Sequence, residues 1–479
     1  MTKLAEGSSN KVFLLKFDDG KECIARVPCP GLASEPLVIS SEVATLDFVR
    51  RHLDIPAVPK VLAWSTDGAD SEVGSSYIIM ERSPGVPLTD VRYSAVGGRE
   101  LFDHVINPVI SMEKIVGGPR FSQIGSLYFK EDVSDELKSR RLYAPDVPDD
   151  EASDIYRIGP TVQHDFWKDE RKDLDIDRGP WPDIHSYAVA VAERERRWIT
   201  AFARDPPSGA FLKGPFRSPD QHHRLLDAFL ATVQGLEIPS DFSPFVLWHP
   251  DAHRANVLVQ EHGPPEVTGL VDWQHAWIGP RFLQLLVPPA FSHFHTMIDP
   301  VKFDSTPSLP HGFDAMKPED QDYAREELRM VQRERLYQLA LALHDRPRFD
   351  ILNSPLWPSM ALLFHSLSET WTDGPTHSLL AIAKLCRNWD RVGKPGSPCL
   401  VTVPDEAILE LCDDEEHMHE RRTLIEYFCN KARVDSDGGV APEHYEEAKE
   451  YLEQVRKHKW NETAYGPWFA EDSAQPNIS

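Results

Sequence analysis

The chain has 479 residues, 41% of them hydrophobic and 10% aromatic, which describes a globular protein large enough for two or three lobes. Its formal net charge of -25 argues against nucleic acid and against anionic membrane surfaces as partners, because both would repel it. No apolar run approaches the roughly 18 residues that span a bilayer, so we expect no integral membrane segment.

The first predicted element is a β-hairpin. Apolar residues occupy 12–17 and 23–27, and Asp19-Gly20 between them predicts a two-residue turn. On the return strand Arg26 shares a face with Ile24, so its guanidinium can point into a cleft. The alternative is an arginine at a strand edge in solvent.

Just before this hairpin lie three small residues, Gly7, Ser8 and Ser9. Small residues allow backbone N–H groups to approach phosphate oxygens closely. One glycine followed by two serines is also an ordinary turn. The segment is therefore a candidate phosphate loop.

A helix is predicted over 40–53, where apolar residues recur on one face and Glu42 lies in the first turns. Two further strands are predicted over 60–64 and 76–80. The Pro- and Gly-containing linker at 81–87 that follows indicates a hinge between lobes.

The region 93–216 is long for a connection and contains helical patterns at 110–116 and 185–203. Long loops beside a catalytic centre commonly carry substrate contacts. A solvated insertion is the alternative. Another helix is predicted over 221–234.

The most informative stretch follows this helix. An apolar run at 245–248 and a proline lead into Asp251, which places its carboxylate on a loop that leaves a buried segment. A carboxylate in that position can accept a proton from a hydroxyl group. Asp251 is therefore the candidate general base.

Two oxygen ligands follow Asp251 on a second predicted hairpin. Asn256 opens a strand at 257–259, a turn at 261–265 reverses the chain, and a strand at 267–271 returns Asp272 beside Asn256. One amide oxygen and one carboxylate suit Mg²⁺, which takes few protein ligands and keeps phosphate oxygens as the rest. The sequence thus indicates phosphoryl transfer.

The residues His249, Asp251, Asn256 and Asp272 match the H-x-D-x-x-x-x-N motif and the following hairpin aspartate of the protein-kinase-like superfamily. The chain resembles the aminoglycoside phosphotransferase (APH) and choline kinase branch of that superfamily. The resemblance implies that Asp251 is catalytic, that His249 supports the loop structurally, and that Asn256 and Asp272 hold magnesium. Singly, each residue also fits a core histidine, a turn or a cap.

The resemblance also assigns roles in the N-terminal part. The strand residue that holds the nucleotide phosphates is typically a lysine, and Arg26 stands there, with a different length and fork geometry. Glu42 would pair with Arg26, although a glutamate early in a helix is also favoured by the helix dipole. The Glu81 carbonyl and the Ser83 N–H would meet adenine, with Met80 behind the base.

The segments at 3–30, 41–50, 55–65 and 77–88 look like a fungal subgroup of the family, typified by altered inheritance of mitochondria protein 9. In that subgroup an Ala-Arg-x-Pro strand, here around Arg26, is usual. After Asp272 the sequence departs from the antibiotic-kinase pattern, since Leu283 stands where a last aspartate is typical.

The expected fold is α+β and bilobal, protein-kinase-like, with a small antiparallel-sheet N-lobe and a large, mostly helical C-lobe. We expect the N-lobe at 1–80, the hinge at 81–87, the C-lobe with its insert at 88–300, and a helical C-terminal extension at 301–479.

The expected function is ATP- and Mg²⁺-dependent transfer of phosphate to a small-molecule hydroxyl, for which the acidic charge favours a cationic acceptor. The alternative is a catalytically weak or inactive nucleotide-binding pseudokinase that acts through a protein partner. The resemblance implies a mitochondrial location; a cytoplasmic one is the alternative, because no presequence is visible.

Overall fold

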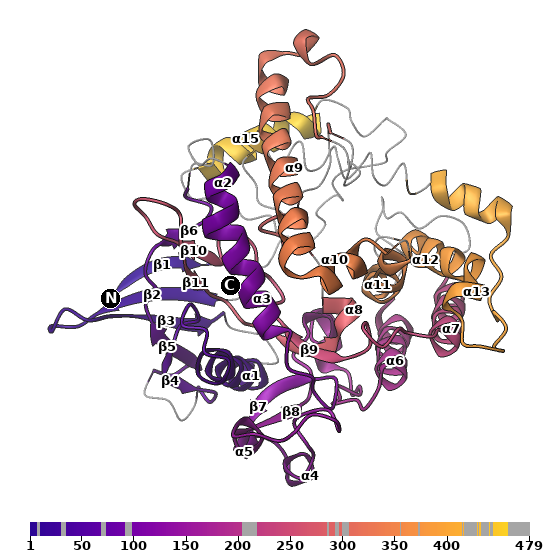
Figure 1. Cartoon of the computed structure of the whole chain (residues 1–479), viewed down its shortest axis with the longest axis horizontal. Helices are drawn as coiled ribbons and strands as arrows, with labels where there is room; N and C mark the ends of the chain where they lie inside the picture. The colour runs from indigo at the N-terminus through magenta and orange to yellow at the C-terminus, as the bar shows by residue number, and fades with distance from the viewer. Residues whose placement is uncertain are drawn as a thin grey trace. The chain divides into compact units, whose positions relative to one another are not determined.

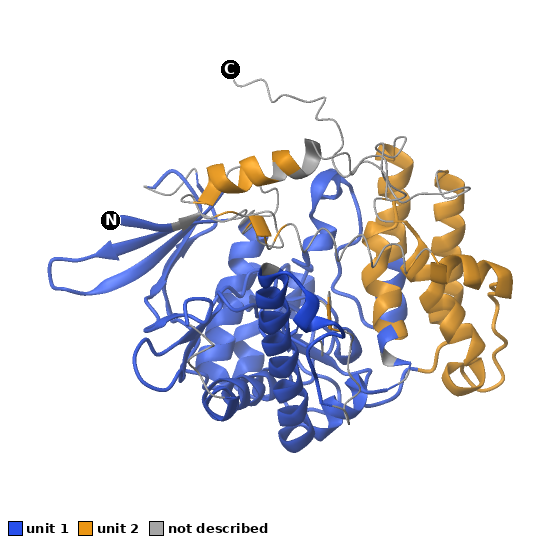
Figure 2. Cartoon of the chain, turned by 90° about the horizontal axis from the view of Figure 1, so that it is seen from above, with its two compact units in different colours: residues 1–190, 238–293, 300–358 blue, residues 191–237, 294–299, 359–479 orange. Residues whose placement is uncertain are grey.

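The computed structural model separates the chain into two compact units, coloured in Figure 2. Unit 1 comprises 1–190, 238–293 and 300–358, and unit 2 comprises 191–237, 294–299 and 359–479. The structure describes residues 1–6, 10–29, 35–68, 73–91, 98–203, 218–284, 287–292, 297–298, 306–354, 356–371, 374–413, 415, 429, 431–432, 440 and 444–457.

Unit 1 begins with a five-stranded antiparallel sheet (Figure 1). In sheet order its strands are β1 (Thr2–Glu6), β2 (Asn10–Lys16), β3 (Glu22–Pro28), β5 (Tyr77–Glu81) and β4 (Val61–Ser65). Four of these strands were predicted from the sequence, and their bounds differ from the predicted ones by one or two residues.

The turn between β2 and β3 differs from the prediction. Its loop has three residues, Asp18, Asp19 and Gly20, closed by a hydrogen bond from Phe17 N to Lys21 O of 2.9 Å. Gly20 has φ +84°, a left-handed conformation that glycine adopts without steric cost. The predicted two-residue turn is wrong because this glycine ends a three-residue loop.

Helix α1 (Glu35–Asp47) and the π-helical turn η1 (Phe48–His52) follow the hairpin. Ile39 and Val43 of α1 form a buried cluster with Ile78 and Met80 of β5, so this helix packs on the sheet. The helix begins five residues before the predicted start. Pro36 is tolerated there, since the first helical turn lacks N–H partners in any case.

The predicted catalytic hairpin is present as β10 (Val257–Val259) and β11 (Val267–Leu270), and β6 (Val86–Pro87) pairs with β10. Gly85, with φ +97°, allows the chain to enter this sheet, because a β-carbon there would lie 2.3 Å from Val259 O. Strand β9 (Phe245–Trp248) pairs separately with β12 (Trp277–Pro280).

The remaining elements of unit 1 enclose a large core that includes Phe48, Ile110, Trp273 and Tyr337. Helices α3 and α9 lie side by side in it (Figure 1). These elements are α2 (Gly98–Leu101), η3 (Phe102–Ile106), α3 (Asn107–Val116), β7 (Ser126–Phe129), α4 (Asp135–Lys138), α5 (Ala152–Ile155), β8 (Tyr156–Gly159), α8 (Arg281–Gln284), α9 (Pro318–His344) and α10 (Arg346–Leu352).

Unit 2 is helical and packs through aromatic contacts such as Phe229 on Phe364, whose ring centroids lie 5.2 Å apart. Its helices are α7 (Pro219–Gly235), most of α11 (Trp357–His365), α12 (Thr376–Arg387), α13 (Trp389–Val392) and α15 (Tyr445–Lys457), and α6 (Ile184–Phe202) runs from unit 1 into unit 2.

The units divide the chain at other places than the lobes expected from the sequence: 300–358 belongs to unit 1 and 191–237 to unit 2. The predicted lobe limits stay a prediction. Over the described ranges, no helix combines the length and the apolar character that crossing a membrane requires.

Candidate active site

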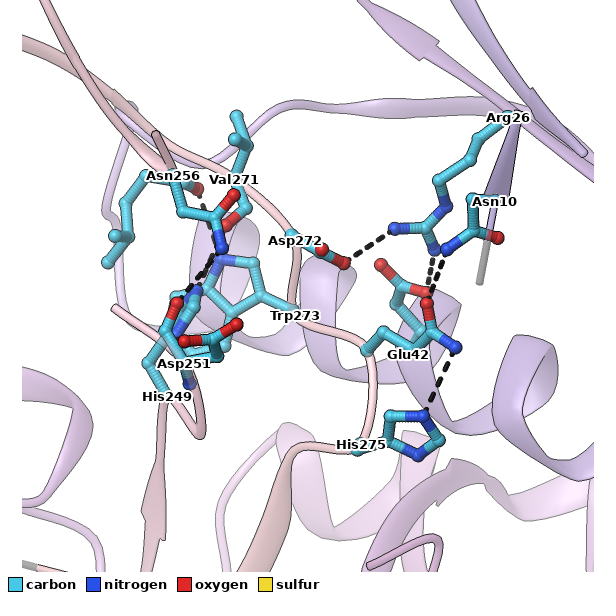
Figure 3. Close-up of polar contacts among 12 residues, drawn as sticks. Asn10, Arg26, Glu42, His249, Asp251, Asn256, Val271, Asp272, Trp273 and His275 are labelled. Carbon is cyan, nitrogen blue, oxygen red and sulfur yellow. Dashed lines mark hydrogen bonds and ion pairs between the residues drawn. The ribbon is translucent and has the colours of Figure 1, made fainter. Parts of the chain in front are cut away.

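Asp251 lies on a turn just after strand β9, where the sequence predicted it, and its side chain is 58% exposed. His249 lies next to Asp251 and holds this turn through both ring nitrogens (Figure 3). Its Nε2 lies 3.0 Å from Val271 O and its Nδ1 lies 3.2 Å from Asp251 N. The ring therefore donates at Nε2 and accepts the Asp251 N–H at Nδ1.

This use of both ring nitrogens requires a neutral imidazole. Burial lowers the pKa of His249 from 6.5 to about 4, although the Val271 carbonyl and Asp272 favour the charged form. The ring also packs edge-on against Trp273, with centroids 4.6 Å apart. These contacts fit the structural support that the resemblance implies for His249.

Asn256 is buried, and its Nδ2 donates to Asp251 O at 2.9 Å. Because the amide nitrogen faces the loop, the amide oxygen Oδ1 is the atom that can accept a cation. The backbone bond from Val271 N to Asn256 O, 3.0 Å, holds the two strands together and brings Asp272 next to Asn256. The hairpin geometry predicted for these two residues is present.

Asp272 has φ +63°, a left-handed conformation that is uncommon for a residue other than glycine. Its side chain is 42% exposed, and Oδ1 accepts a hydrogen bond from Arg26 Nη1 at 2.9 Å. Backbone strain of this kind gathers at functional sites and re-aims a side chain. Here it turns the carboxylate toward the N-terminal sheet (Figure 3).

Arg26 is buried, with 8% of its surface exposed, so the alternative of a strand-edge arginine in solvent is wrong. Its Nη2 pairs with the Glu42 carboxylate, as the resemblance implies. Burial lowers the pKa of Arg26, an effect that the facing Asp272 opposes. Arg26 thus lies between two carboxylates, and the one from Asp272 was not predicted.

The residues predicted to contact adenine are Met80, Glu81 and Ser83, and the structure shows their protein contacts. Met80 is buried in the cluster beneath α1, and the Glu81 carboxylate pairs with Arg50 at 3.0 Å on the hinge. Ser83 lies against Gly269 of β11. Their roles toward adenine stay predictions. Gly7, Ser8 and Ser9 lie outside the described residues.

Two residues near the centre were missed. Gln274 Oε1 accepts from Asn10 Nδ2 at 2.5 Å, which links the start of β2 to the segment after Asp272. His275, with φ +63°, is anchored through Nδ1 to Val162 O at 2.7 Å. No periodicity marks either residue, and only their position directly after Asp272 could have drawn attention to them.

Magnesium fits the residues present. Asn256 offers an amide oxygen and Asp272 a second carboxylate oxygen, Oδ2, beside the one that Arg26 binds. Within the part of the chain that the structure describes, no three His, Cys, Asp or Glu side chains gather to hold a metal. Two oxygen ligands with open positions suit a cation that keeps phosphate oxygens.

A five-stranded antiparallel sheet, a turn with Asp251 and a hairpin that brings Asp272 to Arg26 of the sheet are the arrangement of a protein-kinase-like fold. The sequence pattern of the phosphotransferase enzyme family (APH) matches residues 1–152 and 166–285, more than half of the chain. The chain belongs to this family.

Among curated proteins, a subtelomeric hrmA-associated cluster protein of Aspergillus fumigatus is 29% identical over 95% of this chain and 92% of its own length. The mitochondrial altered inheritance of mitochondria protein 9 of Yarrowia lipolytica is 30% identical over 59% of this chain and 50% of its own length. The predicted resemblance to that subgroup is confirmed.

Among solved structures, a thermostable mutant of aminoglycoside phosphotransferase APH(4)-Ia, in a ternary complex with AMP-PNP and hygromycin B, matches 80% of this chain and 90% of its own. The identity is 16% and the TM-score 0.36.

Proposed function

We propose that the protein transfers phosphate from ATP to a hydroxyl group of a small molecule, with Mg²⁺ as the metal. The observation that carries the proposal is the placement of Asp251, Asn256 and Asp272 on one turn and one hairpin, opposite the Arg26–Glu42 pair. Membership in a phosphotransferase family supports the reaction class.

Each residue has a distinct role in this proposal. Asp251 accepts the proton of the acceptor hydroxyl, since its carboxylate is exposed while His249 fixes its backbone. Asn256 Oδ1 and Asp272 would hold magnesium, which neutralises charge on the transferred phosphate when bound. Arg26, kept in place by Glu42, would bind phosphate oxygens with its guanidinium.

A second candidate function is a catalytically weak or inactive pseudokinase that acts through a protein partner. The 2.9 Å ion pair between Arg26 and Asp272 Oδ1 favours it, because the arginine neutralises the carboxylate that magnesium would use and leaves it only Oδ2. In the transferase, the metal nucleotide competes with Arg26 for this carboxylate. The two functions therefore differ in whether Asp272 exchanges its partner.

The proposed location is the mitochondrion, supported by relatives whose names place them there. A cytoplasmic location remains the alternative. For the acceptor we propose a small molecule, with a cationic one favoured by the acidic charge of the chain.

The test is single-turnover phosphate transfer from radiolabelled ATP across a panel of small hydroxylated metabolites. Asp251→Asn should abolish transfer, because the amide cannot accept the proton, and should leave nucleotide affinity within about twofold of wild type. Transfer that persists in Asp251→Asn would exclude Asp251 as the base. Binding without transfer to any acceptor would favour the pseudokinase.

A further inference from the structure

Unit 1 contains a buried charged network of Glu113, Tyr337 and Arg348. Glu113 of α3 accepts hydrogen bonds through Oε2 from Arg348 Nη1 of α10, 2.6 Å, and from the Tyr337 hydroxyl of α9, 2.7 Å. Its other oxygen, Oε1, is buried and has no hydrogen-bond partner among the described residues. Three helices that are distant in sequence therefore meet at one carboxylate.

The network places the Arg348 guanidinium against the strand that leads into the active site. The Arg348 guanidinium carbon lies 4.5 Å from the ring centroid of Trp248, the last residue of β9. Arg348 is 2% exposed and Trp248 8%, so water does not screen this contact. Trp248 directly precedes His249, the residue that fixes Asp251.

Gly117 also lies against the Trp248 indole and leaves little room for it to move. A β-carbon at Gly117, just after α3, would lie 3.2 Å from the six-membered ring of Trp248 and 3.2 Å from the backbone oxygen of Glu113. The backbone of Gly117 has φ -81°, a value that any residue adopts, so a side chain there would press on the indole and on the last turn of α3. The Trp248 ring is thus confined by α3 as well as by Arg348.

The arginine itself is held in place at the start of α10. The Asp345 side chain accepts a hydrogen bond from Arg348 N at 3.4 Å and caps the helix. Lys114 of α3 donates to His344 O at 3.1 Å, which ties the end of α9 to α3. Both contacts fix where the guanidinium lies.

We propose that Arg348 is a positioning residue for the catalytic turn: held by Glu113 and Tyr337, its guanidinium fixes the Trp248 indole and thereby the register of His249 and Asp251. This proposal rests on the proposed phosphotransferase function. It gives α9 and α10, which the sequence placed in a helical extension, a role in the active site.

A purely structural role for the network is the alternative. A variant that lacks the network but remains folded separates the two roles. A buried ion pair replaced as a whole by apolar residues of similar volume often leaves stability unchanged or higher, because its desolvation is costly. The triple variant Glu113→Leu, Tyr337→Phe, Arg348→Met removes every polar group of the network and leaves no buried charge behind. If the network were only structural, this folded variant would behave as wild type.

The experiment measures hydrogen–deuterium exchange in peptides that cover residues 249–256. Amides of this turn are protected by bonds such as His253 N to Asp251 O, 2.9 Å, and Asn256 N to His253 O, 3.0 Å. In the triple variant we expect exchange in these peptides to be at least about tenfold faster, with peptides from β2 and β3 unchanged. Single-turnover transfer should fall about tenfold while nucleotide affinity stays within about twofold.

Arg157→Met is the matched control, because Arg157 is another buried arginine of unit 1, and it donates to the backbone carbonyls of Lys138, Ser153 and Tyr156. It should leave exchange at 249–256 at the wild-type rate. Gly117→Ala is a second probe, which keeps the charges and crowds both the Trp248 indole and the Glu113 carbonyl, and it should accelerate exchange at the same peptides.

Wild-type exchange at 249–256 in the folded triple variant would overturn the proposal. Should the triple variant not fold, unchanged exchange in Gly117→Ala would overturn it as well. A wild-type protein that shows no transfer counts against the proposed function alone, since the exchange measurement still tests whether Arg348 positions the turn.

Discussion

Acidification should release the catalytic turn, because protonation of His249 puts a hydrogen on the nitrogen that accepts the Asp251 N–H. In the folded protein Nδ1 lies 3.2 Å from Asp251 N, and Nε2 already donates to Val271 O. Burial lowers the pKa of this imidazole to about 4 from 6.5. The folded state therefore binds this proton less readily than the unfolded chain.

This difference in proton binding makes the free energy of unfolding fall as the pH falls. A group whose folded pKa is depressed stabilises the fold fully above its unfolded pKa of 6.5, and the stabilisation is lost as the pH falls toward 4. The lowered pKa corresponds to about 3 kcal/mol of unfolding free energy, lost between these two pH values. Below pH 4 His249 should add no further change.

The assay is urea unfolding at pH values from 7.5 to about 4.5, with wild type compared to His249→Asn. The asparagine Oδ1 takes the place of Nδ1 and can accept the Asp251 N–H, but the side chain does not titrate. His262→Asn, in the exposed turn between β10 and β11, is the matched control. Carboxylates titrate in all three proteins, so the difference between curves isolates His249.

We expect the wild type and His262→Asn to lose about 2 kcal/mol more than His249→Asn between pH 6.5 and about 5. Parallel curves for all three proteins would refute the reasoning, because they would show that His249 binds its proton equally well in the folded and unfolded chain.

Three further predictions follow from contacts at the site. Arg26→Met should lower the free energy of unfolding by about 3 to 5 kcal/mol in urea titrations, since it leaves the Glu42 carboxylate buried without its cation. Arg82→Met removes an exposed pair with Glu22 and should cost far less. Equal losses in the two variants would contradict this. Gly85→Ala should cost at least about 2 kcal/mol by the same measurement, because a β-carbon would meet a backbone oxygen at 2.3 Å, and Gly263→Ala, at φ +90° with its nearest neighbour 3.8 Å away, should cost clearly less. Arg26→Lys should tighten Mg²⁺ binding in calorimetric titrations with ADP present, because the shorter cation loosens its hold on Asp272; weaker binding would show that the 2.9 Å ion pair does not compete with the metal.

The catalytic hairpin could be predicted because its signals are local. Short apolar runs at 257–259 and 267–271 and the turn with Gly-Pro-Pro between them lie within about a dozen residues of Asn256 and Asp272, and the strands β10 and β11 follow these runs. The pairing of Arg26 with Glu42 was implied by the resemblance to kinases, in which a helix glutamate pairs with this strand residue. Such inferences need only neighbouring segments.

The contacts that were missed join distant segments. Arg26 and Asp272 are 246 residues apart, and Arg348 and Glu113 are 235 apart, so no periodicity or spacing relates them. The φ of +63° at Asp272 was not predicted either, although aspartate adopts positive φ more readily than most residues, because no local pattern marks this position as left-handed. The turn at Gly20 failed for another reason, because Asp-Gly fits both two-residue and three-residue loops.

Thermal unfolding of the wild type and of Asp272→Ala, each with and without ATP and Mg²⁺, tests the central claim most directly. Nucleotide at about 100 times its dissociation constant should stabilise the wild type by roughly 2.7 kcal/mol. The variant should gain markedly less, because one of the two magnesium ligands is gone. Equal stabilisation of both proteins, or of neither, would contradict a metal–nucleotide site built on Asn256 and Asp272.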